Sequence, residues 1–344
     1  MTYKAMVLSA PRTIEARWIE RPTVGAGEAL VRVRAANLCP TDIKKWKDDS
    51  LARLLADTPL ILGHEMAGEI VEIGLGCGAF AVGDRVAIDP VLRSLAPDGR
   101  EYLKGIGAAA GSSTDNVALL RDEGIGGGFA ELVKVPAGNL IALPDDVSFE
   151  AASLIEPLAD IVHGITKSGD VSGKRCAVFG LGPMGLMHVE LLAFLGAEVV
   201  GVDPRDDRRE ESLSFGAKMA VAPGQTPRVD VAYVAAGGGA LAPACAEALK
   251  ALGKDGKLVI FASGTKDASI PLDLNAVHYG NQTVIGVVGF RPEDATRTIE
   301  LLGQGAIDVD RIRHPLIGLD GLQEAFGKMG EPGTFKYGID LART

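Results

Sequence analysis

Apolar and polar residues alternate over short stretches in the first half of the chain. Residues 5–8, 29–33 and 69–73 are rich in strand-forming residues, and proline, glycine or charged residues bound each stretch. Short runs of this kind predict β-strands joined by turns. We therefore expect residues 1–157 to be mainly β-structure, with an irregular segment over residues 92–126, which are rich in glycine, alanine and serine.

From about residue 170 the pattern changes to apolar strands that alternate with helical periodicity. Strands are predicted over residues 174–180, 198–203, 229–235, 257–262 and 283–288. Helices are predicted over residues 184–195, 205–215 and 292–302. This β-α-β succession implies a parallel sheet with helices on both faces, so the predicted fold class is α/β with a doubly wound parallel sheet.

A glycine motif follows the first of these strands and opens the next helix. It reads Gly180-Leu181-Gly182-Pro183-Met184-Gly185. The first glycine permits a tight turn, the second lets the backbone approach a pyrophosphate, and the third allows close helix–strand packing. The phosphates would then lie at a helix N-terminus, where free N–H groups favour anions. The motif predicts a dinucleotide-binding site.

Asp203 ends the next predicted strand, about twenty residues beyond the glycines, as the dinucleotide fingerprint requires. Its carboxylate can accept hydrogen bonds from the adenosine ribose and would repel a 2′-phosphate. Arg205, Arg208 and Arg209 follow closely, and they could either neutralise such a phosphate or form a solvated helix face. The sequence favours NAD as the cofactor.

Four residues in the first half form a candidate metal-ligand set: Cys39, His64, Glu65 and Glu156. A thiolate, an imidazole and carboxylates together are typical of a catalytic zinc site that keeps one position open. Three of these residues also have an ordinary interpretation. Cys39 could be a small buried apolar residue, His64 a hydrogen-bonded core histidine, and Glu156 a helix-capping carboxylate. Their joint presence favours the metal site.

Taken in order, these motifs resemble those of the zinc-dependent medium-chain dehydrogenases/reductases of the alcohol dehydrogenase superfamily, in particular the sorbitol, threonine and polyol dehydrogenase branch. The resemblance covers essentially the whole chain. It rests on the glycine motif at 180–185 and on Cys39-x-Thr41-Asp42, Gly63-His64-Glu65, Gly83-Asp84-Arg85-Val86, Gly127-Gly128-Phe129-Ala130-Glu131 and Glu156-Pro157-Leu158. It implies a GroES-like catalytic domain formed by residues 1–157 and 292–344, and a Rossmann domain over residues 158–291.

The resemblance also implies roles for the metal ligands. Glu65 and Glu156 would each bind zinc either directly or through water. Many members of the family carry four closely spaced cysteines that bind a structural zinc, and this chain has no cysteine in residues 92–126. We therefore expect one catalytic zinc and no structural zinc.

Further roles follow from the same resemblance. Thr41 matches the hydroxyl that takes the substrate proton, although a strand-end threonine without a role is the alternative. Lys44 stands where many relatives have a relay histidine, so it would either relay the proton or leave that step to water. Asp42 would be structural or support the ligands. Arg208 matches a basic residue that flanks the adenosine ribose even in NAD-specific members.

The predicted activity is hydride transfer between NAD and a secondary alcohol of a polyol, sugar or hydroxy acid. The alternatives are an NAD(P)H-dependent ketone or ketosugar reductase, or a non-catalytic nucleotide-binding protein on the same fold. Polyol dehydrogenases often have an arginine–aromatic pair where this chain reads Gly289-Phe290-Arg291, which argues against a sorbitol-like substrate. The family resemblance also suggests a homodimer or homotetramer.

Composition narrows the partners. The length of 344 residues suits about two domains. A net charge of −10 argues against nucleic acid or an anionic membrane as a partner. No apolar run approaches a membrane span, and the amino-terminal run is too short for a signal peptide. The four cysteines show no paired spacing, so we expect a reduced, cytoplasmic protein in which Cys77 lies at the surface.

Overall fold

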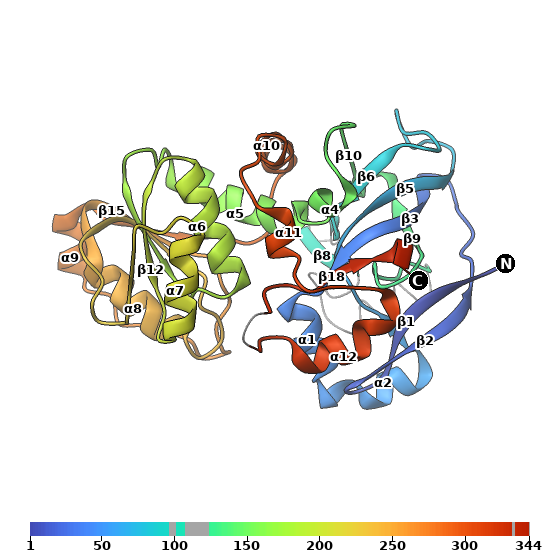
Figure 1. Cartoon of the computed structure of the whole chain (residues 1–344), viewed down its shortest axis with the longest axis horizontal. Coiled ribbons are helices and arrows are strands. Elements are labelled where there is room, and N and C mark those ends of the chain that lie inside the picture. Colours follow the sequence, from blue (N-terminus) through green and yellow to red (C-terminus); the bar gives the residue numbers. More distant parts are fainter. Residues whose placement is uncertain (96–100, 107–123, 332–333, 344) are drawn as a thin grey trace. The chain divides into compact units, whose positions relative to one another are not determined.

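The computed structural model describes residues 1–95, 101–106, 124–331 and 334–343 (Figure 1). The chain divides into two compact units, one formed by Met1–Glu156 with Val309–Thr344 and the other by Pro157–Asp308. The return to the first unit therefore comes after Asp308, whereas the sequence placed it at residue 292. Helix α10 (Pro292–Gly303) belongs to the second unit because it packs on α5 (Ile155–Ser168), where His163 Nδ1 lies 2.8 Å from Asp294 Oδ2.

The first unit consists mainly of antiparallel β-structure. One sheet has the strand order β2-β1-β4, and a larger sheet has the order β10-β6-β5-β3-β18-β17, with β9 also paired to β3. The strands are β1 (Thr2–Ala10), β2 (Thr13–Glu20), β3 (Glu28–Asn37), β4 (Leu60–Ile61), β5 (Glu65–Ile73), β6 (Arg85–Ile88), β9 (Leu132–Pro136), β10 (Leu140–Ala142), β17 (Leu316–Ile317) and β18 (Gly338–Asp340). The helices are α1 (Pro40–Trp46), α2 (Ala52–Asp57), α4 (Phe149–Ala152), α11 (Val309–Ile312) and α12 (Leu322–Lys328). The three predicted strands are confirmed within β1, β3 and β5.

Strand β18 shows how the end of the chain completes the first unit. It pairs with β3 in antiparallel register, and Figure 1 shows the red C-terminal strand beside the blue β3. Phe326 of α12 packs edge-on against Phe129, with ring centroids 6.1 Å apart. The C-terminal segment is therefore part of the same core that holds the start of the chain.

The prediction of an irregular segment over residues 92–126 was wrong for residues 92–95 and 101–105, whereas residues 124–126 form no helix or strand. Strands β7 (Val91–Leu95) and β8 (Glu101–Gly105) form an antiparallel pair there. The rest of the segment, residues 96–100 and 107–123, lies outside the described residues.

The second unit is the predicted parallel sheet. Its strands lie in the order β13-β12-β11-β14-β15-β16. Successive strands are added on one side of β11 up to β13 and on its other side from β14 onwards, so the topological switch point lies between β11 and β14. The strands are β11 (Arg175–Phe179), β12 (Glu198–Val202), β13 (Met219–Val221), β14 (Val229–Val234), β15 (Leu252–Ile260) and β16 (Thr283–Gly286). The remaining helices are α6 (Pro183–Phe194), α7 (Asp206–Ser214), α8 (Leu241–Ala251) and α9 (Leu274–Gly280). Every strand and helix predicted for this region is confirmed.

All four cysteines are free thiols. Cys77 is buried, and its Sγ lies 3.3 Å from the carbonyl oxygen of Glu28, so the expectation of a surface thiol was wrong. Within the described ranges, no helix combines the length and apolarity that a membrane crossing requires.

Candidate functional site

Cys39 lies where β3 leads into α1. It is the N-cap residue of α1, and Pro40 follows at the first helical position, where the missing N–H has no partner to lose. The fully buried carboxylate of Asp42 accepts a hydrogen bond from the Cys39 N–H through Oδ2 at 3.0 Å. Its other oxygen accepts from the Gly63 N–H at 3.1 Å. Asp42 thus holds together the two loops that carry Cys39 and His64.

His64 and Glu65 are brought to the same place by the turn that opens β5. Gly63 has φ of +90°, a left-handed conformation that favours glycine, and a side chain there would meet the Phe129 ring. Adjacent residues within a strand face opposite ways, but His64 precedes β5 and only Glu65 belongs to it. As a result, ligand atoms of Cys39, His64 and Glu65 all lie within 4.8 Å of one another.

Lys336 is a site residue that the sequence reasoning missed. Its ammonium donates a hydrogen bond to Glu65 Oε1 at 2.5 Å, and both side chains are fully buried. The two residues are 271 positions apart in the chain. No local motif marks this lysine, because only the pairing of β18 with β3 brings its segment to the site.

The three residues fit a zinc ion. Glu65 Oε2 is buried and has no hydrogen-bond partner in the part of the chain that the structure describes, although Lys336 occupies Oε1. A buried acceptor of this kind calls for an explanation such as a bound ion. His64 Nδ1 is also buried, lies 3.4 Å from Asp42 Oδ1 and has no hydrogen-bond partner among the described residues. Sulfur, nitrogen and carboxylate oxygen together are a zinc-type donor set.

The electrostatics of the site reflect crowded, buried charges. Burial raises the pKa of the Cys39 thiol, and the Glu65 carboxylate adds to this effect, while His64 and Lys336 oppose it. Burial disfavours the charged form of His64, yet Asp42 and Cys39 raise its pKa well above the usual value. Burial, helped by Glu65, raises the pKa of Glu156 to about 7. Glu156 therefore lies in the same electrostatic neighbourhood, but it is outside the compact trio.

Thr41 and Lys44 lie on α1. The Thr41 hydroxyl oxygen is 3.8 Å from Cys39 Sγ, and Thr41 is exposed. Lys44 is exposed in the last turn of the helix, whereas Lys45 is buried. The structure thus places the predicted proton acceptor directly beside the predicted metal ligand, and it places Lys44 on the same helix.

The glycines of the dinucleotide motif have three different surroundings. Gly180 has φ of +89°, and a Cβ there would lie 2.7 Å from the Ala236 nitrogen. A Cβ on Gly185 would lie 1.8 Å from the Gly180 carbonyl oxygen. Gly182, the N-cap of α6, has φ of −71°, and a Cβ there would meet no atom within 4 Å. Packing requires the first and third glycines, whereas the space beside the second is open to a ligand.

Asp203 is held beside the turn that the glycine motif forms after β11. Its Oδ2 accepts a hydrogen bond from the Leu181 N–H at 2.8 Å, and its Oδ1 accepts from the Arg205 N–H at 2.9 Å. The turn after β11 and the end of β12 are therefore tied together. Pro183 and Met184 begin α6, and the Met184 carbonyl accepts from His188 Nδ1 at 2.8 Å.

The three arginines that follow Asp203 are all paired with carboxylates. Arg205 pairs with Asp207 and Arg209 with Asp206. Arg208 is buried and pairs with Glu211 at 2.9 Å. These pairs lie within α7 or at its start, so the guanidinium charges are already compensated.

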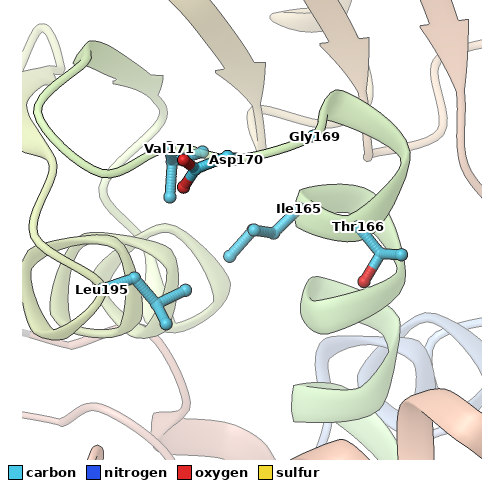
Figure 2. A pocket seen from close by; sticks show the side chains of 6 residues that line it. All are labelled: Ile165, Thr166, Gly169, Asp170, Val171 and Leu195. Atoms are coloured by element: carbon cyan, nitrogen blue, oxygen red, sulfur yellow. The ribbon is translucent and has the colours of Figure 1, made fainter.

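A separate hollow lies in the second unit, at the end of α5. It is lined by Ile165, Thr166, Gly169, Asp170, Val171 and Leu195 (Figure 2). Asp170 is the one ionisable residue among these six, and its Oδ1 accepts a hydrogen bond from the Ser172 N–H. None of the predicted site residues lines this hollow.

Comparison with protein families gives two matches that lie one in each half of the chain. The alcohol dehydrogenase GroES-like domain matches residues 25–145. The zinc-binding dehydrogenase domain matches residues 183–304. The order of the two matches agrees with the β-rich first unit and the parallel sheet of the second.

Individual relatives span nearly the same length. (R,R)-butanediol dehydrogenase from Bacillus subtilis (strain 168) is 29% identical over 92% of this chain and 93% of its own. L-threonine 3-dehydrogenase from Caldanaerobacter subterraneus subsp. tengcongensis is 30% identical over 85% of this chain and 84% of its own. A crystal structure from Sinorhizobium meliloti 1021 with NADP bound is 25% identical, covers 99% of both chains and has a TM-score of 0.82.

Proposed function

Because this chain belongs to the zinc-dependent medium-chain alcohol dehydrogenase superfamily, we propose that it transfers a hydride between NAD and a secondary alcohol of a polyol, sugar or hydroxy acid. One observation carries the proposal. Cys39, His64 and Glu65 converge to within 4.8 Å, and the free oxygen of the buried Glu65 carboxylate has no hydrogen-bond partner among the described residues.

In this proposal Cys39, His64 and Glu65 hold the metal, and Glu156 lies close enough to contribute directly or through water. A bound zinc ion acts as a Lewis acid that makes the alcohol hydroxyl easier to deprotonate. Asp42 orients the loops of Cys39 and His64 through its two backbone hydrogen bonds. Lys336 compensates part of the negative charge and fixes the rotamer of Glu65.

The proton of the alcohol must leave before the hydride can. Thr41 is suited to accept it because its hydroxyl oxygen lies 3.8 Å from Cys39 Sγ and the residue is exposed. From there the proton passes to solvent, either through Lys44 or through water. The Thr41 hydroxyl can accept one proton while it gives up its own, so it transfers a proton without becoming charged.

The second unit supplies the cofactor site. The pyrophosphate would lie at the N-terminus of α6, in the open space beside Gly182, and Asp203 would accept hydrogen bonds from the adenosine ribose. We favour NAD over NADP because the arginines at 205, 208 and 209 are paired with neighbouring carboxylates and a 2′-phosphate would meet the Asp203 carboxylate. NADP, the cofactor in the Sinorhizobium meliloti structure, is the alternative.

We extend the proposal to the assembly. Strand β16 is an edge of the parallel sheet, and Val284 on it is 43% exposed. None of the residues of the neighbouring α9 is buried, and Leu274 and Tyr279 on it are largely exposed. An exposed apolar sheet edge suits a two-fold contact with a second copy of the chain.

Four free cysteines suit a reducing compartment, so we place the activity in the cytoplasm.

The direct test is a panel of secondary alcohols, polyols, sugars and hydroxy acids, assayed with NAD by NADH absorbance at 340 nm. We expect oxidation of at least one class, loss of that activity after treatment with a strong chelator, and recovery on addition of zinc. Activity that is unaffected by complete removal of metal would contradict the proposal.

A further inference from the structure

A buried polar cluster lies beside the metal-binding trio and takes no part in it. It consists of Asn37, Ser153 and Arg313, whose exposed fractions are 0%, 1% and 4%. Asn37 ends β3, two residues before Cys39. Ser153 follows α4, three residues before Glu156, and Arg313 follows α11. The Asn37 cluster therefore joins three separate segments of the first unit, two of which lead directly to site residues.

The amide of Asn37 is the centre of this cluster. Its Nδ2 donates hydrogen bonds to the Ser153 carbonyl oxygen at 3.0 Å and to Ser153 Oγ at 3.1 Å. Its Oδ1 accepts from Arg313 Nε at 2.8 Å. Both polar atoms of the side chain are thus engaged, and they fix the end of β3 relative to the end of α4 on one side and the C-terminal segment on the other.

Arg313 extends the same contacts to the main chain. Its Nη2 donates to the Ala36 carbonyl oxygen at 3.5 Å and to the Ile339 carbonyl oxygen at 3.3 Å. Ile339 lies on β18, three residues after Lys336. The guanidinium therefore spans the β3–β18 pair, whose two segments carry Cys39 and the lysine that holds Glu65.

Filling part of a core with such a cluster is energetically unfavourable compared with filling it with apolar residues. Burying an amide and a guanidinium carries a desolvation penalty, and well-packed apolar residues of similar volume are often as stable or more stable. In exchange, fully satisfied polar groups define one geometry more strictly than apolar contacts do. That strictness matters at a metal site, where ligand distances must be held to about 0.2 Å.

We propose that the Asn37 cluster positions the metal ligands, by fixing the spacing between the segment of Cys39 and the segment of Glu156. This inference rests on the proposed zinc site. Its consequence is that loosening the cluster lowers metal affinity, even in a variant that folds normally, because the donor atoms are no longer held ready for the ion.

The test uses Ser153→Ala, which removes one acceptor of the Asn37 amide and leaves the Ser153 carbonyl in place. Ser168→Ala in the second unit is a matched control. Both serines are buried, and each donates its hydroxyl to the carbonyl three residues earlier, at 2.7 Å for Ser153 and 2.8 Å for Ser168. Asn37→Ala removes the whole amide and is the stronger perturbation.

The metal-free full-length proteins would be titrated with cobalt(II) alone and followed by their visible spectra, with urea unfolding measured in parallel. We expect Ser153→Ala to bind cobalt about tenfold more weakly than the parent, with an altered spectrum, and Ser168→Ala to bind it as the parent does. If Asn37→Ala folds, it should weaken binding further. Equal cobalt affinity in the parent and Ser153→Ala would overturn this inference alone. A parent that binds no cobalt would overturn the proposed function and this inference with it.

Discussion

Asp203 offers the clearest test at the scale of a single residue. Asp203→Ala should weaken NAD binding, because the ribose loses its acceptor, and should improve NADP binding relative to NAD, because the repulsion of a 2′-phosphate disappears. Each tenfold change in the preference corresponds to about 1.4 kcal/mol. The measurement is the ratio of kcat/KM with the two cofactors.

A matched control is Asp230→Ala. The Asp230 carboxylate also accepts a backbone hydrogen bond in the second unit, from the Arg175 N–H at 2.9 Å. This variant should leave the cofactor ratio unchanged. Equal use of NAD and NADP by the parent would show that the role assigned to Asp203 is wrong.

The sequence predicted the residues of the site to the extent that they lie in short motifs. Cys39, His64 and Glu65 each lie in a short motif that can be recognised locally, and the structure brings their ligand atoms within 4.8 Å of one another; that they hold a metal stays a prediction. Lys336 was missed because it reaches Glu65 only through the pairing of two strands far apart in the chain. The Asn37 cluster was missed for the same reason, since its contacts join segments more than a hundred residues apart.

At the scale of the element, α6 allows packing to be separated from ligand binding. Gly185→Ala would press a methyl group against the Gly180 carbonyl and should destabilise the protein by about 1–3 kcal/mol or more. Gly182→Ala meets no atom within 4 Å and keeps an allowed φ, so the fold should be preserved while NADH affinity falls. Urea unfolding and NADH fluorescence titration of both variants measure the two effects. If Gly182→Ala binds NADH as tightly as the parent does, the cofactor phosphates do not lie beside Gly182.

The interior of α6 also predicts a pH dependence of stability. Burial lowers the pKa of His188 to about 4, against a usual value of 6.5, although its hydrogen bond to Met184 opposes the shift. The unfolded chain therefore takes up this proton at a higher pH than the folded chain does. The contribution of His188 is complete above about pH 6.5 and is lost as the pH falls towards 4, by about 3 kcal/mol in all.

Thermal unfolding between pH 7 and pH 4 would measure this loss. His188→Leu should show a smaller decline in Tm than the parent over this range, and His278→Leu, which changes an exposed histidine of α9, should follow the parent. If the parent and His188→Leu declined in parallel, the buried neutral state of His188 would be refuted.

The elements themselves were largely predictable, because their signals are local. The parallel strands and helices of the second unit followed from periodicity, and the glycine motif at 180–185 fixed where β11 ends. The antiparallel pair of β7 and β8 was not predicted, since its strands are short and lie in a region rich in small residues. The point of return to the first unit depends on the packing of α10 on α5, which the sequence pattern does not express.

At the scale of the whole molecule, the exposed edge strand β16 predicts self-association. Val284→Lys places a charge on that edge and should shift the protein towards monomers, as measured by analytical ultracentrifugation over a range of concentrations. Val82→Lys, at another exposed valine in the first unit, is the control and should not change the assembly. A parent that is monomeric at all concentrations would contradict the proposed contact.

The central claim is a single catalytic zinc held by Cys39, and its most direct test is the zinc content of purified, chelator-washed protein. We predict one zinc per chain in the parent. We predict almost none in Cys39→Ser, because a serine hydroxyl is not ionised near neutral pH and binds zinc weakly. The variant should still bind NADH, since the second unit has its own core, while alcohol oxidation falls by several orders of magnitude. Thr41→Val, the neighbouring control, should keep its zinc and lose only turnover. Two tightly held zinc ions per chain, or a zinc-free Cys39→Ser that oxidises the alcohol at the parent rate, would contradict this account.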